Sequence, residues 1–136
     1  MAQVKTYTAP DRAQFSSTVL TKSLAFLSLA AIVVVHFLDL GDKLAETPYL
    51  GYAYLALIAG CLVAAFMIAR TGDRRGWLLG GALALGAIIA YALTRTTGLP
   101  GAMDDIGNWL EPLGVVALIS EGVMVLLSAY VLGRDV

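Results

Sequence analysis

One acidic residue, Glu121, falls inside an otherwise apolar stretch and is the side chain in this sequence best placed to do chemistry. The stretch LGVVALISEGVMVLLSAYVL covers residues 113–132, and at about 1.5 Å per helical residue Glu121 lies near its middle. A carboxyl group at such a depth in a membrane is costly, whether charged or unpaired, and burial favours the neutral acid.

Three interpretations of Glu121 stay open. It can be a protonated, hydrogen-bonded contact between helices, a proton- or ligand-binding group, or a contact with another subunit. Its candidate partners inside the chain are Ser28, Tyr91 and Arg95.

The single histidine, His36, lies near the end of the first apolar stretch, with Asp39 three residues later. Residues at this spacing share a helix face. Imidazole and carboxylate suit divalent metal ions, and imidazole also binds haem iron, so a metal or haem site built on His36 and Asp39 is one alternative. The chain has no second histidine and one cysteine, Cys61. We therefore expect His36 to pair with Asp39 or to hydrogen-bond a neighbour, and we expect no metal and no cofactor.

Arg95 begins the longest polar connection of the chain, TRTTGLPGAMDDIGNWLEP, residues 94–112. We expect it to pair with Asp104, Asp105, Glu111 or Glu121. The segment AMDDIGNWLEP could form a short amphipathic helix at the interface, with Trp109 as an aromatic anchor. The connection is expected to form an ordered cap, whose candidate residues are Asp104, Asp105, Trp109 and Glu111.

The composition predicts what holds these residues in place. Of the 136 residues, 59% are hydrophobic and 14% are charged, and the net charge is −1. Soluble domains average roughly 45–50% apolar and about 25% charged residues, so a soluble domain, a disordered chain and a nucleic-acid-binding protein are excluded. No nucleophile–base pairing, phosphate-binding glycine pattern or redox cysteine pair is present in the sequence, and we expect no enzymatic activity.

Four apolar stretches are long enough to cross a bilayer, which requires about 20 residues in a helix. They cover residues 19–38, 49–69, 77–93 and 113–132, after a polar segment, 1–18, and before a short tail, 133–136. None of them alternates with a period of two, so helices are favoured over barrel strands. We predict an all-α, integral membrane four-helix bundle in which the first stretch is a retained anchor. The small residues Gly76, Gly80 and Ala84 are expected to face Ala56, Gly60 and Ala64.

The cations indicate the orientation. One side of the predicted membrane carries seven of them, and the other side carries Lys43 and Arg95. The seven are Lys5, Arg12, Lys22, Arg70, Arg74, Arg75 and Arg134. By the positive-inside rule both termini should be cytoplasmic, and the long connection should be outside. The outer face is then acidic, with Asp39, Asp42, Glu46, Asp104, Asp105 and Glu111.

The run HFLDLGDKLAETPYLGYAYL, with TRTTGLPG, DDIGNWLEPLG and the glutamate of the fourth stretch, carries a resemblance. It resembles an uncharacterised group of small four-helix integral membrane proteins of high-GC Gram-positive (actinobacterial) bacteria. The resemblance implies a plasma membrane location and no particular activity. It draws attention to His36, Arg95, Trp109, Glu111 and Glu121.

Three functional hypotheses follow. The first is a non-catalytic accessory subunit of a larger membrane complex, for example a respiratory one. The second is a small homo-oligomeric transporter or ion-handling protein that uses Glu121. The third is a metal- or haem-binding membrane protein that uses His36. The expected partners are the lipid bilayer and either other membrane subunits or further copies of the chain.

Overall fold

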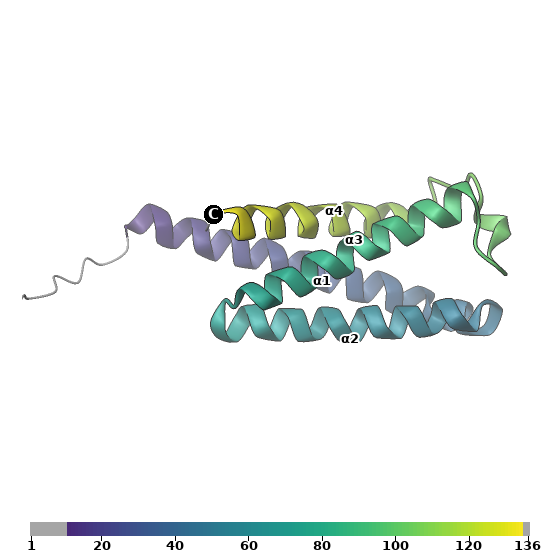
Figure 1. Cartoon of the computed structure of the whole chain (residues 1–136), viewed down its shortest axis with the longest axis horizontal. Coiled ribbons are helices and arrows are strands. Elements are labelled where there is room, and N and C mark those ends of the chain that lie inside the picture. Colours follow the sequence, from purple (N-terminus) through teal and green to yellow (C-terminus); the bar gives the residue numbers. More distant parts are fainter. Residues whose placement is uncertain (1–10, 135–136) are drawn as a thin grey trace, which may run out of the picture.

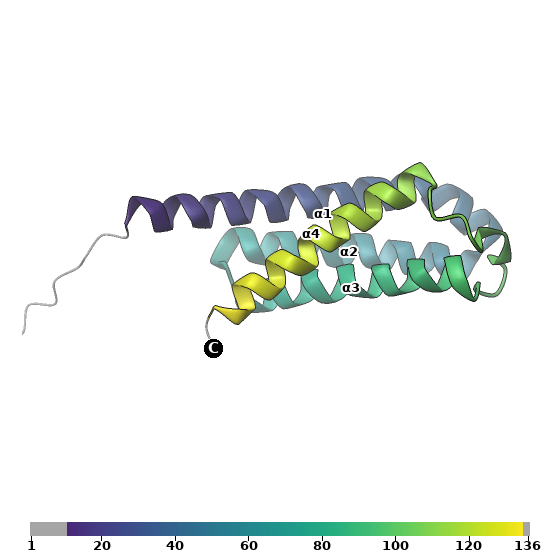
Figure 2. The ribbon, with the colours of Figure 1, turned by 90° about the horizontal axis from the view of Figure 1, so that it is seen from above.

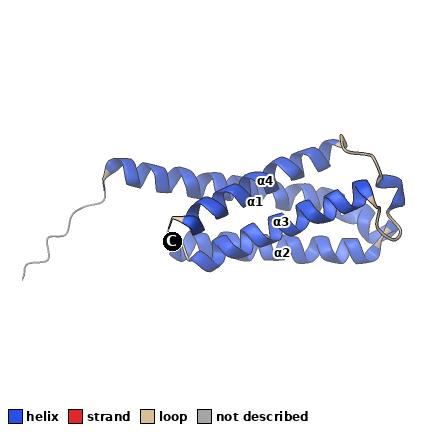
Figure 3. Cartoon of the chain, turned by 45° about the horizontal axis from the view of Figure 1, so that its top comes forward, coloured by secondary structure: helices blue, strands red, loops and turns tan. Residues whose placement is uncertain are grey.

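The computed structural model describes residues 11–134, and within them it is all-helical, as the sequence predicts (Figures 1 and 3). The helices are α1 (Arg12–Glu46), α2 (Pro48–Thr71), α3 (Arg74–Thr96) and α4 (Pro112–Gly133), and the 3-10 helix η1 (Met103–Asp105) lies in the long connection. All four α-helices are long and apolar enough to cross a membrane. Residues 1–10 and 135–136, which belong to the predicted N-terminal segment and C-terminal tail, lie outside the described range.

The four helices run alternately up and down and pack as a ring of neighbours. α1 packs against α2 and α4, and α3 packs against the same two helices (Figures 1 and 2). The short α1–α2 and α2–α3 connections enforce the antiparallel arrangement, because so few residues can only reverse the chain direction.

Local chemistry explains where the helices begin and end. Thr47, between α1 and α2, has φ −138° and ψ 75°, which lies outside the helical region. A residue that precedes a proline avoids the helical conformation, and this explains why α1 ends before Thr47. α2 ends at Gly72, whose φ of 62° is a left-handed conformation that glycine adopts without strain. Asp73 then caps α3 by accepting a hydrogen bond from the Arg75 backbone N–H.

α1 is longer than its apolar core of residues 19–38 suggests. The helix passes through Gly41 without a break and continues to Glu46. A glycine inside a helix costs only about 1 kcal/mol. At the other end, the hydroxyls of Ser17 and Thr18 donate to the carbonyl oxygen of Gln14 within the same helix. The 35 residues of α1 span about 52 Å, so its first turns extend beyond the other helices (Figure 2).

The core is a compact set of apolar side chains contributed by all four helices, most of them small or medium in size. Its buried members are Ala25, Leu29, Ile32, Leu57, Cys61, Ala64, Ile68, Trp77, Ala84 and Met124. Many larger apolar side chains point outward instead, among them Leu27, Phe37, Leu78 and Leu126. This distribution suits a bundle whose outer faces meet lipid.

The small residues of α3 allow close approach to two helices. A Cβ placed on Gly76 would lie 2.9 Å from the Met67 Cβ, so this end of α3 lies against α2, but it meets Met67 and Ile68 rather than the expected small residues. A Cβ on Gly80 would lie 3.6 Å from the Ala64 Cβ, but also 2.7 Å from the Met124 Cε of α4. The glycine face of α3 therefore serves α4 as well as α2.

We predict that Gly76→Ala lowers the free energy of unfolding by about 1–3 kcal/mol, the usual cost of overpacking. The added Cβ would meet both the Met67 Cβ and, at 3.1 Å, the Ile68 backbone nitrogen, neither of which can rotate away. The matched control is Gly86→Ala on the same helix, where nothing lies within 4 Å. It should leave stability unchanged or raise it by up to about 1 kcal/mol. Unfolding in detergent measures both, and equal losses would contradict the packing described.

Candidate functional site

The helices form a partly open cavity of about 510 Å³ toward the end of the bundle where α1 joins α2. α3 lies close to α2 at its start and then crosses away from it toward α4 (Figure 1). The cavity is lined by residues of all four helices and of the long connection, including His36, Tyr54, Arg95 and Glu121. Three of these four residues were singled out from the sequence, and they come from separate helices.

At the inner part of this cavity, His36 and Glu121 form a pair. The His36 Nε2 lies 3.8 Å from the Glu121 Oε1, and the two residues are 8% and 1% exposed. The His36 Nδ1 lies 2.9 Å from the Ile32 carbonyl oxygen. Because a carbonyl oxygen only accepts hydrogen bonds, Nδ1 carries a proton, and Nε2 faces the carboxyl group. Glu121 thus meets the one histidine of the chain rather than the expected Ser28, Tyr91 or Arg95.

Tyr54 of α2 completes the inner site. Its ring meets the His36 ring edge-on, with the centroids 4.7 Å apart, and its hydroxyl donates to the Asp39 Oδ2 at 3.2 Å. Asp39 is therefore held by Tyr54 and not by His36, the partner expected from their spacing. Nothing in the sequence distinguishes Tyr54, because a tyrosine near the end of a membrane helix is common as an interfacial anchor.

Nearer the end of the bundle, Asp105 contacts two cations. Its Oδ2 lies 3.2 Å from the Arg95 Nη1 and 3.8 Å from the Lys43 Nζ. Arg95 is 8% exposed, and its guanidinium stacks over the Tyr91 ring at 4.4 Å. Arg95 thus pairs with one of the four carboxylates that its position suggested. Lys43, from α1, was not expected to join it, since nothing in the sequence relates it to Asp105.

The long connection is fastened to the helices at several points. The Tyr91 hydroxyl donates to the Trp109 carbonyl oxygen at 3.1 Å, and the Tyr49 hydroxyl donates to the Pro100 carbonyl oxygen at 2.6 Å. Glu111 caps α4 by accepting hydrogen bonds from the backbone N–H groups of Leu113 and Gly114. These contacts make residues 97–111 an ordered cover beside the cavity.

The structure of this connection differs from two of the expectations drawn from the sequence. The only helix described between residues 97 and 111 is the three-residue η1, so no amphipathic helix forms over the segment AMDDIGNWLEP. Positive φ angles at Gly98, Gly101 and Gly107 turn the chain repeatedly and explain why it cannot continue as a helix. Asp104, another expected cap residue, is exposed, whereas Asp105 contacts Arg95 and the Trp109 ring meets the Tyr91 ring edge-on, with the centroids 6.0 Å apart.

Within residues 11–134, no three His, Cys, Asp or Glu side chains gather into a set that could hold a metal ion. His36 and Asp39, the candidates for metal binding, each have another partner, Ile32 and Tyr54. What the cavity does offer is a buried acid beside a histidine.

Comparison with protein-family models, curated proteins and solved structures finds no match to this chain. Its function has to be inferred from the chemistry of the cavity itself.

We predict that Asp105→Asn destabilises the protein by about 1–3 kcal/mol, since the buried Arg95 would lose its counter-charge. The neighbouring Asp104→Asn removes the same charge from an exposed position and should change stability by less than about 0.5 kcal/mol. Thermal unfolding of the two variants in one detergent makes the comparison. Equal stability of both variants would show that the Arg95–Asp105 contact does not hold the connection in place.

Proposed function

We propose that the protein is a small multi-pass membrane protein that binds and releases a proton at the His36–Glu121 pair. It corresponds to the second of the three hypotheses drawn from the sequence, an ion-handling protein that uses Glu121. The observation that carries the proposal is that both side chains are buried, lie 3.8 Å apart and line the same cavity. An ionisable pair that lines a cavity inside a membrane protein is typical of proton relays and ion pathways.

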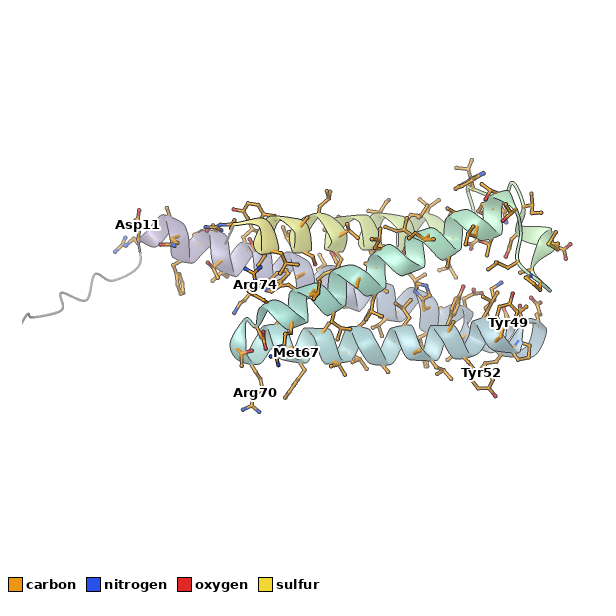
Figure 4. The ribbon with its side chains drawn as sticks, viewed as in Figure 1. Asp11, Tyr49, Tyr52, Met67, Arg70 and Arg74 are labelled. Atoms are coloured by element: carbon orange, nitrogen blue, oxygen red, sulfur yellow. The ribbon has the colours of Figure 1, made fainter. Side chains whose placement is uncertain are left out.

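The charge distribution supports an orientation with both termini in the cytoplasm of a plasma membrane. Arg70 and Arg74 lie at the α2–α3 turn, at the opposite end of α2 from Tyr49 and Tyr52 (Figure 4). The same end holds Lys22, whose Nζ approaches Gly72, and Arg74, which donates to the Leu132 carbonyl oxygen. A cationic end of this kind normally stays inside the cell. The cavity, at the other end, then faces the outside.

The pair has the chemistry to exchange a proton between its two members. With the His36 Nδ1 donating to Ile32, the Nε2 lone pair can take the proton of a neutral Glu121, which gives an imidazolium beside a carboxylate. Both arrangements have zero net charge. Loss of the proton would leave one bare carboxylate among apolar helices, a costly state that favours taking a cation from the cavity.

Fewer structural observations support the other functional hypotheses. Accessory-subunit, metal- and haem-binding roles, and the resemblance to actinobacterial membrane proteins, stay predictions. The accessory role is compatible with α1, whose first turns extend beyond the bundle with Phe15, Val19 and Leu20 exposed. The proton-binding proposal is the one that uses the buried residues.

Infrared spectroscopy of the protein in lipid bilayers tests this proposal. Wild-type protein should show a protonated carboxyl band that disappears as the pH is raised, and Glu121→Gln should lack it. His36→Gln should keep the band but change the pH at which it disappears, because the two groups titrate as a pair. The control Asp42→Asn alters an exposed carboxylate of α1 outside the cavity lining and should leave the band unchanged. A band that persists in Glu121→Gln would overturn the proposal.

A further inference from the structure

The cavity is much larger than a proton site requires. Its volume of about 510 Å³ falls within the range of roughly 300–1,000 Å³ that is typical of small-molecule sites. Small side chains of α2 and α3 create this space, among them Ala53, Gly86, Ala87 and Ala90. Mostly apolar walls with a few polar groups are the usual composition of a site for an organic molecule.

The charges in the lining favour a cationic occupant. Four carboxylates line the cavity, from Asp39, Asp105, Glu111 and Glu121, against the two permanent cations Lys43 and Arg95. When Glu121 is ionised, a positively charged occupant, whether a proton or a ligand, reduces this imbalance, whereas an anion would increase it.

Most of these charged groups are already engaged. Asp105 contacts both cations, Glu111 caps α4, and Asp39 accepts from Tyr54. Glu121 differs, because its Oε2 is buried and has no hydrogen-bond partner. Among the described residues, this is the one fully buried carboxylate oxygen without a hydrogen-bond partner, and it lies at the inner part of the cavity. The Arg95 Nε is also unpartnered, but its guanidinium is already neutralised by Asp105 and stacked on Tyr91.

Aromatic rings add to the preference for a cation. The rings of Tyr54 and Tyr91 line the cavity from α2 and α3, and a cation that lies over such a ring gains favourable electrostatic energy. Tyr54 stands beside His36 and so lies close to the acid.

We propose that the cavity binds a lipophilic organic monocation, which displaces the proton of Glu121. This inference rests on the proposed proton-binding function. In the exchange the Glu121 O–H bond breaks, the proton leaves to water, and the positive charge of the ligand takes its place beside the carboxylate. No electron is transferred, and the charge inside the cavity is the same before and after.

The groups that face Glu121 set the pH dependence of this exchange. They are His36 from α1 and Cys61 from α2. Arg95, the cation of α3, stacks on Tyr91, which contacts Gly114, and Glu121 is two helical turns, about 10 Å, beyond Gly114 on α4. Proton and ligand therefore compete chiefly at Glu121 and His36, and ligand binding should strengthen as the pH rises.

Two ions of matched size and opposite charge test the proposal on purified protein in lipid nanodiscs. Tetraphenylphosphonium should bind saturably, more tightly at higher pH and with release of a proton. Tetraphenylborate should not bind saturably. Glu121→Gln should weaken phosphonium binding about tenfold or more, as expected when an interaction with a charged group is lost. Asp42→Asn should bind as the wild type does. Empty nanodiscs correct for partition of both ions into lipid.

Several outcomes would overturn the inference. They are equal saturable binding of the two ions, binding of the borate alone, pH-independent binding, or no phosphonium binding to folded wild-type protein. The comparison of the two ions uses the wild type, so it remains decisive if Glu121→Gln does not fold. If the carboxyl band of Glu121 titrates but no phosphonium binds, the ligand inference fails and the proton-binding function stands. If the carboxyl band does not titrate and no phosphonium binds, both the proton-binding function and the ligand inference fail.

Discussion

Inside a bundle of four apolar helices, each polar side chain has to find its partner within the chain, and this constraint shapes the rest of the structure. In the proposed membrane setting, no water reaches the outer faces of the helices, so an unpaired charge has no other source of stabilisation. Arg95 meets this requirement through Asp105, and His36 meets it through the Ile32 carbonyl. Among the charged side chains Glu121 meets it least well, since its Oε2 has no hydrogen-bond partner and its Oε1 lies 3.8 Å from the His36 Nε2. We take that incomplete satisfaction as the sign of a functional group.

The small residues of the bundle have two separate consequences. At the cytoplasmic end of the proposed orientation, Gly76 and Gly80 allow α3 to pack closely on α2 and α4. Toward the other end α3 leaves α2, and the glycine and alanines at positions 86, 87 and 90 line the cavity instead of filling it. The long connection then fixes the diverging ends through Asp105 and through the Tyr91 contact with Trp109. Close packing at one end and a lined space at the other thus come from the same residue types.

The fold was largely predictable, whereas the site was predictable only in its parts. Apolar runs of sufficient length indicate four helices, and the structure confirms them. The ends of the helices were harder to predict. α1 continues through Gly41, because the cost of one glycine does not outweigh the helical preference of the residues around it. Glu121 and His36 were each conspicuous by residue type. Their pairing, however, depends on the axial position of α4 relative to α1, which no local sequence pattern predicts. Tyr54 and Lys43 look like ordinary interfacial residues until the helices are brought together.

The proposed mechanism depends above all on four membrane crossings that leave the arginine-rich turn inside the cell and the cavity outside. Thiol labelling of intact cells with a membrane-impermeant reagent measures this directly. Wild-type protein should not react, because its one thiol, Cys61, is buried. Asp104→Cys, in the long connection, should be labelled at once, and Thr71→Cys, in the α2–α3 turn, only after the cells are made permeable. Labelling of Thr71→Cys in intact cells would contradict the orientation and the access of the cavity to the outside.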